Sequence, residues 1–456
     1  MRGGYVGSPE VIRQYSQKWQ ILLRSPLWNT ADSRNRWSVS EREVIMFQPL
    51  KGVKVIDLTY FVGGPGAARI LADWGADVIK VEPGFGDPGR GTGATMSCPT
   101  EKDCNPFYTI YNMNKRGIAL NLKKEEGKAI LDKILETADV FVSSYRTGAL
   151  KRLGLDYDSL SKKFPHLIWA QINGFGDFGP AKDNAGFDTV AFWARSGAMI
   201  DLTEKDTSPI NPLIGFGDAT TSCSLAGGIS AALYQKAKTG QGCKVMISLF
   251  GQAIWSESAG MVSVQYGDEY PKTRLNPGSP VMDTYCSSDG KWFYMSILEP
   301  DRYNNKLFEE LGLTDLIDNP DFATAVGSKA HSAELVSILA PAFAQHTMEE
   351  IEGMFARADI AYDHVQHLSE VVNDPQALEN KYIVPFANND GTVTKQPTTP
   401  IRFTLKEPET IDDIAPTLDR QAPMIGEHTV EVLKEYGYSD DLIQKYIEDG
   451  VVTVTK

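Results

Sequence analysis

The chain has 456 residues, of which 42% are hydrophobic and 23% charged, a balance typical of a globular protein with two or three domains. A formal net charge of −14 argues against a nucleic-acid partner, because phosphate binding requires a basic surface. No apolar run reaches the roughly 18 residues of a membrane span, so no membrane partner is expected.

Cysteine and histidine usage narrows the chemistry further. The five cysteines include no CxxC pair, and the first residues lack the apolar stretch of a secretory signal. These features predict reduced thiols and a cytoplasmic location. The six histidines stand apart from a cluster of further ligands, so we expect no metal site.

The first predicted element lies in an N-terminal extension, residues 1–48. A short amphipathic helix is expected to open at Ser8, with Pro9 in its first position. We expect this extension to pack on the main body or on a partner subunit.

From Leu50 onward, strands and helices alternate. β-Branched apolar runs at 52–60 and 76–83 flank a glycine-rich turn and a helix at 63–75, which together make a βαβ unit. Further strands are predicted at 117–122, 139–145, 167–174 and 242–250, and further helices at 124–138, at 148–164 and from Asp218 to about Lys238. This alternation predicts an α/β fold, with an open, mostly parallel, Rossmann-like sheet and helices on both faces.

The pattern also predicts the domain organisation. A large Rossmann-like domain is expected at 49–250, a linker at 251–279 and a second, smaller α+β domain at 280–365. Two strands of the smaller domain are expected to join around Ser288-Asp289-Gly290. Residues 366–456 are expected to return to the large domain and to end in two helices joined at Gly437.

The turn Gly64-Pro65-Gly66 stands where a dinucleotide-binding fold contacts a pyrophosphate. A Rossmann fingerprint ends in glycine or alanine, whereas Arg69 occupies that position here, and Pro65 lacks the amide that would face a phosphate. The turn is therefore either a plain strand-to-helix connection or a site for a ligand other than NAD.

Three basic residues, Lys123, Arg146 and Arg152, follow strand ends in the same stretch. Ligands in open α/β sheets bind outside the carboxyl ends of the strands. These residues are therefore either solvated surface charges or contacts for a phosphorylated ligand.

Asp218 stands among small residues in the stretch LIGFGDATTSCSLAGG. Its spacing fits a helix N-cap, worth about 1 kcal/mol. The small neighbours exceed what a cap requires, and Gly227 and Gly228 suggest a large group close to the helix backbone. The chain has no GxSxG elbow, no phosphate loop and no paired Cys and His. A carboxylate kept ionised by a helix N-terminus needs no base, which makes Asp218 the candidate nucleophile.

Ordered stretches from Leu50 to the C-terminus resemble the class III CoA-transferases, the family of formyl-CoA:oxalate and carnitine CoA-transferases. The resemblance is carried by LKGVKVIDLTYFVGGPGAARILADWGADVIKVEP, GDPGR, NKRGIALNLKKEEGK, GALKRLGLDYDSL, INGFGDFGP, GFDTVAF, GFGD and GEHTVEVLKEYGYSDD. AGFDTVAFWARSGA and LIGFGD are most similar to the branch that transfers CoA to (R)-2-hydroxy acids, such as phenyllactate and 2-hydroxyisocaproate, in amino-acid fermentation.

The resemblance implies that Asp218 is the covalent nucleophile. It also implies CoA contacts at Phe61, Val62, Gly63, Leu120, Lys123, Ser144, Tyr145, Arg146, Arg152, Asn173, Gly174 and Phe175. Lys123 and Arg152 are expected to meet CoA phosphates, and Tyr145 is expected to lie against the adenine.

The chain departs from the formyl-CoA enzyme at two contact positions, where Val62 replaces a glutamine and Pro83 replaces an arginine. The glycine-run loop of the oxalate enzyme is also missing after residue 250, which disfavours oxalate as the acceptor.

The same fold serves α-methylacyl-CoA racemases, which are the main alternative. Those enzymes pair the aspartate with a histidine in a GHD motif, whereas this chain has Gly186-Phe187-Asp188. Phenylalanine cannot transfer a proton, so the racemase base pair lacks a member. A non-catalytic acyl-CoA-binding protein is a third alternative. Phe187, Phe192 and Trp193 are either apolar walls for the substrate or core residues.

The expected reaction moves CoA from an acyl-CoA, such as a 2-enoyl-CoA, to a small carboxylic acid through aspartyl anhydride and aspartyl-CoA thioester intermediates. The resemblance implies that CoA thioesters are substrates and that no cofactor is permanently bound. It also implies an interlocked homodimer, in which each chain threads through the other.

Overall fold

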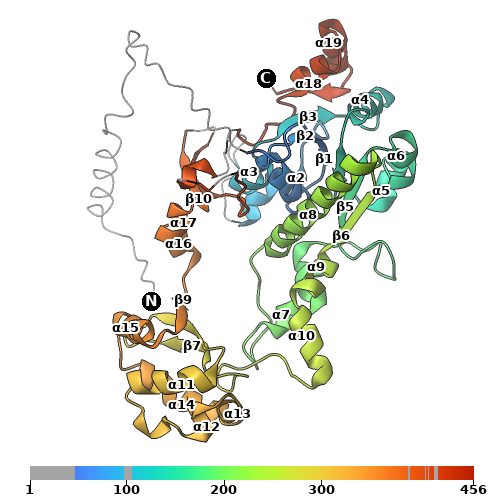
Figure 1. The fold of residues 1–456 in the computed structure, drawn as a ribbon. Helices are drawn as coiled ribbons and strands as arrows, with labels where there is room; N and C mark the ends of the chain where they lie inside the picture. The colour runs from blue at the N-terminus through green and yellow to red at the C-terminus, as the bar shows by residue number, and fades with distance from the viewer. Residues whose placement is uncertain are drawn as a thin grey trace, which may run out of the picture. The chain divides into compact units, whose positions relative to one another are not determined.

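The computed structural model describes residues 47–96, 105–388, 391–405, 407–408, 410–414, 418 and 420–455 (Figure 1). The helix expected from Ser8 therefore lies outside the described residues. No helix of the described part is long and apolar enough to cross a membrane.

A seven-stranded sheet has the strand order β12-β3-β2-β1-β4-β5-β6. Its strands are β1 (Lys54–Leu58), β2 (Asp77–Glu82), β3 (Arg116–Leu120), β4 (Val140–Ser143), β5 (Ile168–Asn173), β6 (Lys244–Ser248) and β12 (Val452–Thr453). All neighbouring strands are parallel except β12 and β3. The predicted open, mostly parallel sheet is thus confirmed. Strand β12 went unpredicted because two residues are too few to show a period.

The strand order contains a switch point between β1 and β4. The chain builds β2 and β3 on one side of β1, then places β4, β5 and β6 on the other side. At such a point the loops after the two central strands diverge, which opens a crevice at their carboxyl ends. The geometry of the sheet therefore places a ligand site after Leu58 and Ser143.

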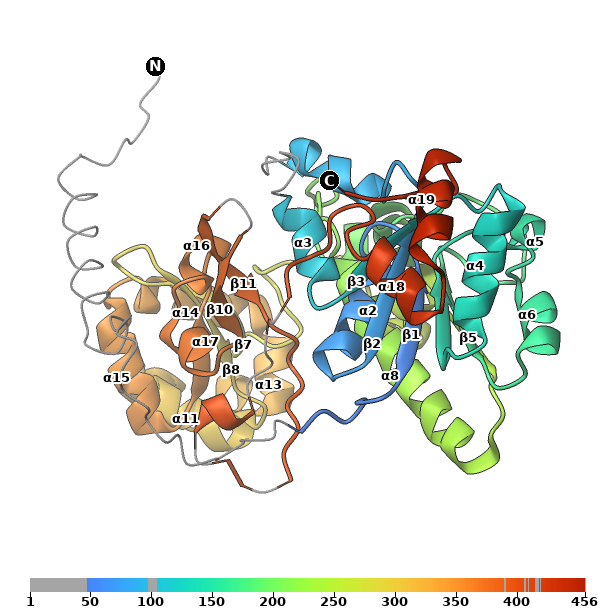
Figure 2. The ribbon, with the colours of Figure 1, turned by 90° about the horizontal axis from the view of Figure 1, so that it is seen from above.

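Helices cover both faces of the sheet (Figures 1 and 2). One face packs against α2 (Gly63–Asp73), the π-helix η2 (Asp188–Ala194), α8 (Phe216–Thr239) and α9 (Leu249–Ser256). The other packs against α4 (Glu125–Leu135), α5 (Thr147–Leu153), α6 (Tyr157–Lys163), α18 (Thr429–Glu435) and α19 (Asp440–Glu448). Successive residues of the central strands alternate between the two cores, as Val55 and Ile56 do.

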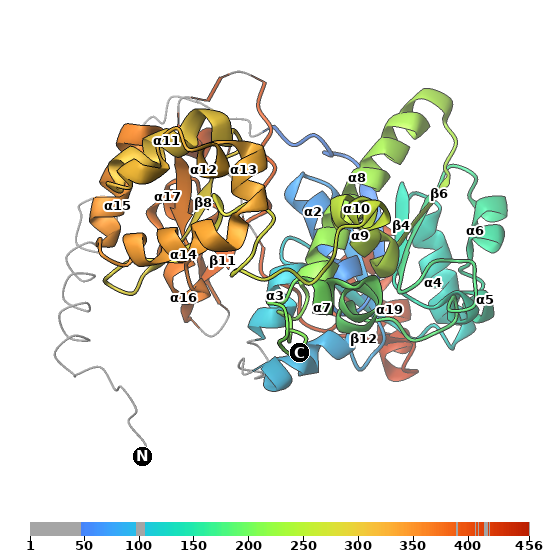
Figure 3. The same ribbon diagram turned by 90° about the horizontal axis from the view of Figure 1, so that it is seen from below.

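Helix α8 lies alongside α2 (Figure 3) and begins earlier than the sequence predicts. Gly215, at φ 82°, precedes its first residue, so Asp218 is the third helical residue and makes no capping bond. The predicted N-cap role is therefore wrong. Of the two glycines expected to lie beside a large group, Gly228 has one in the described chain, because its Cβ would lie 3.2 Å from Val245 Cγ1, whereas a Cβ on Gly227 would meet nothing within 4 Å.

Two smaller antiparallel sheets are formed by β7 (Met282–Cys286), β8 (Trp292–Ser296) and β9 (Ala361–His364), and by β10 (Ile383–Ala387) and β11 (Val393–Pro397). The hairpin predicted around residues 288–290 is confirmed by the pairing of β7 with β8. Phe293, Phe343 and Phe355 meet in the core beside β8. The domain boundaries drawn from the sequence stay predictions.

The other elements are shorter or lie between these sheets. They are η1 (Pro88–Met96), α3 (Pro106–Asn112), α7 (Ala198–Asp201), α10 (Ser258–Ser263), η3 (Val264–Tyr266), α11 (Pro300–Glu310), η4 (Thr314–Leu316), α12 (Pro320–Ala323), α13 (Ala325–Ala330), α14 (Ser332–Phe343), α15 (Met348–Ala358), α16 (Leu368–Val371), α17 (Pro375–Glu379) and η5 (Ile411–Asp413).

Candidate active site

A cavity of about 680 Å³ lies at the carboxyl ends of β1, β4 and β5. Asp218 lines it from α8, together with the loops that follow these three strands. Because β1 and β4 flank the switch point, the cavity occupies the crevice that the sheet topology predicts.

The cavity brings together most of the predicted site residues. Asp218 lines it with Phe61, Val62, Gly63, Ser144, Tyr145, Arg146, Arg152, Asn173 and Gly174. Leu120, Lys123 and Phe175 do not line it. Leu120 is buried in the core, and β3 lies two strands away from β1, which carries Leu120 and Lys123 away from the switch point. As CoA contacts, these three residues stay predictions.

The Asp218 carboxylate lies directly against the first turn of α2. A Cβ on Gly63 would be 2.8 Å from Asp218 Oδ1, so only glycine allows this approach. Ser222 Oγ lies 2.7 Å from the carbonyl oxygen of Gly63 and 2.9 Å from that of Asp218, and so ties the two helices together. Ser222 therefore joins α8 to α2, whereas Gly217, next to Asp218, leaves room for Asp188 and Phe192 of η2.

A second carboxylate, Asp188, supports the turn that carries Asp218. Its Oδ2 accepts the Gly215 N–H at 2.9 Å, and its Oδ1 accepts the Asp218 N–H at 3.1 Å. Asp188 is the first residue of η2 and lies 30 positions before Asp218 in the chain. Sequence reasoning missed this role, although Asp188 belongs to the Gly-Phe-Asp stretch that it examined for a base.

Burial, and to a lesser extent the charge of Asp188, raise the pKa of Asp218 from 3.8 to about 7. Asp218 is therefore only partly ionised at neutral pH, less than expected for a carboxylate held charged by a helix N-terminus. Desolvation by burial outweighs the favourable helix dipole, and the like charge of Asp188 adds to the upward shift of the pKa.

The first turn of α2 presents backbone donors to the cavity. The amides of Gly63 and Gly64 have no hydrogen-bond acceptor among the described residues, as is usual for the first residues of a helix. Pro65 contributes no amide, so the donors are confined to the two glycines beside Asp218. Such a pair suits an oxyanion that forms next to the carboxylate.

Three cations line the open side of the cavity. Arg146 and Arg152 were predicted, whereas Lys182 was missed. None of the three forms an ion pair with a carboxylate in the described ranges of the chain. Lys182 lies in the loop after β5, so the strand-end argument that found the arginines also applies to it. Together they offer an anion site at the rim.

Aromatic rings form the apolar wall. Phe61 and Phe187 meet edge to face with centroids 5.7 Å apart, and both line the cavity. Phe192 and Trp193 are buried in the core, so of the three aromatics left open by the sequence only Phe187 is a wall. Tyr145 packs against Tyr60 with centroids 4.5 Å apart, which occupies one face of its ring.

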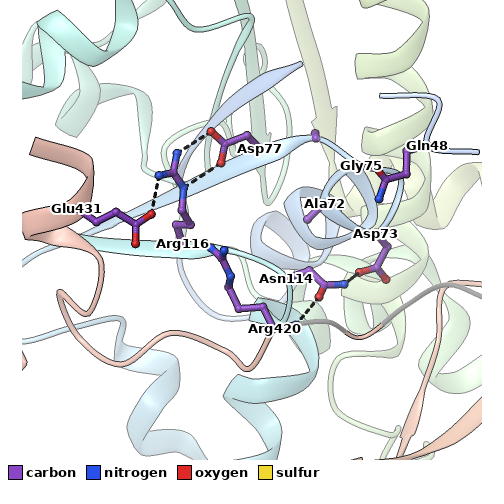
Figure 4. Close-up of a pocket in the computed structure, with 10 residues that line it drawn as sticks. Gln48, Ala72, Asp73, Gly75, Asp77, Asn114, Arg116, Arg420 and Glu431 are labelled. Carbon is purple, nitrogen blue, oxygen red and sulfur yellow. Dashed lines mark hydrogen bonds and ion pairs between the residues drawn. The ribbon is translucent and has the colours of Figure 1, made fainter. Parts of the chain in front are cut away.

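A second cavity, of about 370 Å³, lies at the amino ends of β2 and β3 (Figure 4). Its charged groups largely satisfy one another, because Arg116 binds Asp77 at 2.7 Å and Glu431 at 2.9 Å, and Asn114 donates to Asp73 at 2.7 Å. Parallel sheets bind ligands at the opposite end, so the cavity around Asp218 is the candidate active site. No group of three metal-binding side chains occurs within the described residues.

Comparison with known proteins adds independent findings. Residues 50–429 match the model of CoA-transferase family III. An (R)-2-hydroxy-4-methylpentanoate CoA-transferase of Clostridioides difficile is 37% identical over 403 residues, which cover 88% of this chain and 99% of that protein. A cinnamoyl-CoA:phenyllactate CoA-transferase of Clostridium sporogenes is 36% identical over 409 residues, which cover 89% of this chain and 97% of that protein. The crystal structure of a CAIB/BAIF family protein from Brucella suis gives a TM-score of 0.71 at 28% identity, covering 85% of this chain and 99% of that chain.

Proposed function

The chain belongs to CoA-transferase family III, and we propose that it transfers CoA from an acyl-CoA to a 2-hydroxy acid with Asp218 as the covalent nucleophile. The observation that carries this proposal is the Asp218 carboxylate, which lies in the switch-point cavity against the first turn of α2. No histidine is among the residues that line this cavity. A carboxylate, which attacks without transferring a proton to a base, suits such a site.

The proposed reaction is a double displacement. Asp218 Oδ attacks the donor thioester and expels the CoA thiolate, which leaves a mixed anhydride. The thiolate then attacks the Asp218 acyl carbon, releases the donor carboxylate and forms an aspartyl-CoA thioester. The acceptor carboxylate attacks this thioester and expels CoA, and the thiolate finally attacks the acceptor acyl carbon to free Asp218. No net proton is gained or lost in the cycle.

Two groups of residues are proposed to assist these steps. Each tetrahedral intermediate carries an oxyanion, and the free amides of Gly63 and Gly64 are the proposed donors to it. The cations Arg146, Arg152 and Lys182 are proposed to bind the phosphates of CoA, because they line the same cavity without carboxylate partners in the described chain.

The proposed acceptor is a 2-hydroxy acid with an apolar side chain. The relatives from Clostridioides difficile and Clostridium sporogenes are named for 2-hydroxy-4-methylpentanoate and phenyllactate, acids with branched and aromatic side chains. Phe61 and Phe187 supply an apolar wall that fits such side chains. The matching 2-enoyl-CoA is the proposed donor, which would place the enzyme in amino-acid fermentation in the cytoplasm.

The proposal includes a homodimer. Helices α9 and α10 expose several large apolar side chains, among them Trp255 at 75% exposure, and Tyr266 follows at 88%. Exposed apolar side chains clustered along one segment are typical of an interaction surface. A second copy of the chain is the proposed partner, and the interlocked arrangement remains part of this proposal.

The first experiment replaces the proposed nucleophile. Asp218→Asn keeps the shape of the side chain but removes the attacking carboxylate, so CoA transfer from cinnamoyl-CoA to phenyllactate should fall by at least ~10⁴-fold. In the parent protein, mass spectrometry after mixing with acyl-CoA alone should detect CoA attached to the peptide that contains residue 218. Asp183→Asn, which alters another carboxylate lining the cavity, is the matched control and should retain transfer.

Three outcomes would count against the proposal. Transfer retained by Asp218→Asn would exclude the covalent mechanism, and CoA binding without turnover in the parent would favour a binding protein. Incubation with an (R)-2-methylacyl-CoA in deuterated water should leave the α-carbon unlabelled, because Phe187 cannot act as the second base. Deuterium incorporation with epimerisation would favour the racemase.

A further inference from the structure

The turn between β1 and α2 contains backbone strain beside the active site. Phe61 has φ 64°, a left-handed conformation that is unusual for a residue with a bulky side chain. Such a conformation is strained and persists only where the surroundings hold it. Phe61 stands two positions before Gly63, whose backbone lies against the Asp218 carboxylate.

A buried network of charges lies beneath this turn. Asp57 pairs with Lys115 at 2.8 Å, Asp87 pairs with Lys80 at 3.0 Å, and all four side chains are fully buried. Glu82 and Arg90 extend the network through a 2.7 Å ion pair. Three carboxylates therefore face three cations, and the network carries no net charge.

The network holds the main chain of the turn directly. Lys80 Nζ donates to the carbonyl oxygen of Thr59 at 3.0 Å, and Asp87 Oδ1 accepts the Phe61 N–H at 3.2 Å. Lys115 Nζ donates to the carbonyl oxygen of Pro65 at 2.8 Å, on the far side of the turn. Hydrogen bonds to charged groups therefore hold the backbone on both sides of Phe61, and such bonds are stronger than neutral ones.

The two lysines of this network stay charged at neutral pH. Burial alone would lower the pKa of Lys80, but the carboxylates of Asp87, Asp57 and Glu82 outweigh it and raise that pKa. Burial lowers the pKa of Lys115 to about 8, although the charge of Asp57 acts in the opposite direction. Lys115 is therefore still mostly protonated at pH 7.

Stability alone gives little reason for this arrangement. A buried ion pair often contributes no more than apolar side chains of the same volume, because both charges must be desolvated. The specific feature of this network is its set of bonds to the backbone on both sides of Phe61. What those bonds determine is the place and direction of the first amides of α2.

We propose that Asp87 and Lys80 are positioning residues for the transfer reaction, which hold the strained Thr59–Val62 turn so that the amides of Gly63 and Gly64 face the Asp218 carboxylate. This inference rests on the proposed function. Neither side chain touches the substrate; each acts through the main chain of the turn.

The test is Asp87→Asn in the full-length protein. The new side-chain amide has one oxygen and one NH2 group, and the NH2 group would point either at Lys80 Nζ or at the Phe61 N–H. Because these are donors as well, one of the two hydrogen bonds now made by Asp87 must be lost. A displacement of about 1 Å at a reacting centre costs ~10²-fold in rate, and we expect kcat to fall by about that factor while KM for acyl-CoA changes less than about threefold. Rapid-quench mass spectrometry should show the same loss in the rate of aspartyl-CoA formation.

Asp73→Asn is the matched control, because Asp73 is also a buried carboxylate and lies at the other end of α2 (Figure 4). It pairs with Arg69 at 3.4 Å and does not line the active-site cavity. This variant should lose stability while keeping kcat.

A second variant covers the case in which Asp87→Asn does not fold. Lys80→Met/Asp87→Leu removes both charges together, which avoids an unpaired buried charge, but it also removes both bonds to the turn. Its kcat should fall as in Asp87→Asn. A folded variant of either kind with kcat within about threefold of the parent would overturn the inference, whereas transfer by Asp218→Asn would overturn the proposed function instead.

Discussion

Asp218 and Asp188 form a pair of carboxylates with different tasks. Asp188 accepts the main-chain N–H groups of Gly215 and Asp218, whereas the side chain of Asp218 faces the cavity. The negative charge of Asp188 adds to burial in raising the pKa of Asp218 to about 7. The residue that supports the turn therefore also opposes ionisation of the proposed nucleophile.

This coupling predicts how the rate depends on pH. The proposed mechanism needs ionised Asp218, so kcat/KM of the parent should rise with pH through about 7. Asp188→Asn removes the like charge, which favours ionisation of Asp218, so the acid limb should move to lower pH. The maximum rate should also fall, because one carboxylate acceptor of the Asp218 turn is lost. The measurement is kcat/KM for acyl-CoA between pH 5 and 9.

Asp183→Asn serves as the control for this prediction as well. It removes a carboxylate of the same cavity that makes no bond to the Asp218 turn, so it should leave the acid limb in place. An unchanged limb in Asp188→Asn would show that the charge of Asp188 does not act on Asp218.

At the scale of elements, the candidate active site lies where the first turns of α2 and α8 are in contact. Helices α2 and α8 approach closely because glycines replace larger residues at the contact. A Cβ on Gly66 would lie 2.5 Å from Ser222 Oγ, and one on Gly63 would lie 2.8 Å from Asp218 Oδ1. The hydroxyl of Ser222 closes the contact by approaching carbonyl oxygens of both helices. The amides of α2 and the carboxylate of α8 thus belong to one rigid unit.

Gly63→Ala should therefore damage catalysis more than folding. The added methyl group would displace the Asp218 carboxylate, and kcat for CoA transfer should fall by ~10²-fold. Gly353→Ala in α15 is the matched control, because its Cβ would meet only the mobile end of Arg357, at 3.3 Å. This control should keep kcat and gain about 0.5–1 kcal/mol in urea unfolding, since alanine favours a helix interior. Full activity in Gly63→Ala would contradict the close approach.

At the scale of the whole molecule, the segment α9–η3 leaves apolar surface uncovered. Ile254, Trp255, Val262, Val264 and Tyr266 are all at least 40% exposed in the single chain. The segment also follows β6, the edge strand of the large sheet, so both an edge and an apolar surface are open on this part of the chain. A second copy that covers this segment would bury both.

Light scattering should accordingly give twice the mass of one chain. Trp255→Glu places a charge within the proposed interface and should shift the protein toward the monomer, because a buried unpaired charge is costly. Val326→Glu changes an equally exposed apolar residue of α13, outside this segment, and should leave the dimer intact. A monomeric parent at micromolar concentration would remove the dimer from the proposal.

Much of the fold was predictable because its signals are local. Each buried parallel strand is a short apolar run, and each helix has apolar residues at helical spacing, as in α4 and α14. The edge strand β12 and the start of α8 escaped this reasoning. Strand β12 has only two residues, which are too few to show an alternating pattern. The loop before α8 ends at Gly215 and not at Asp218.

The candidate nucleophile could be proposed from residue type and order alone, and its role stays a prediction. The family resemblance, the absence of a neighbouring base and the small residues around Asp218 pointed to a carboxylate nucleophile without coordinates. Phe187 and Phe192 could not be told apart in the same way, because five positions in a chain do not reveal which ring faces a cavity and which faces the core.

The sequence by itself determined the alternation of strands and helices, the family and the identity of the candidate nucleophile, because these depend on residue types and on neighbours in the chain. Only the tertiary structure decided that Asp218 is no cap, that Asp188 raises its pKa and that a buried charge network holds the strained Phe61 turn. Desolvation and Coulomb interactions act through space, and here they join Asp188 to the turn of Asp218, 30 positions away, and Asp57 to Lys115, 58 positions away, separations at which sequence patterns carry no distance information.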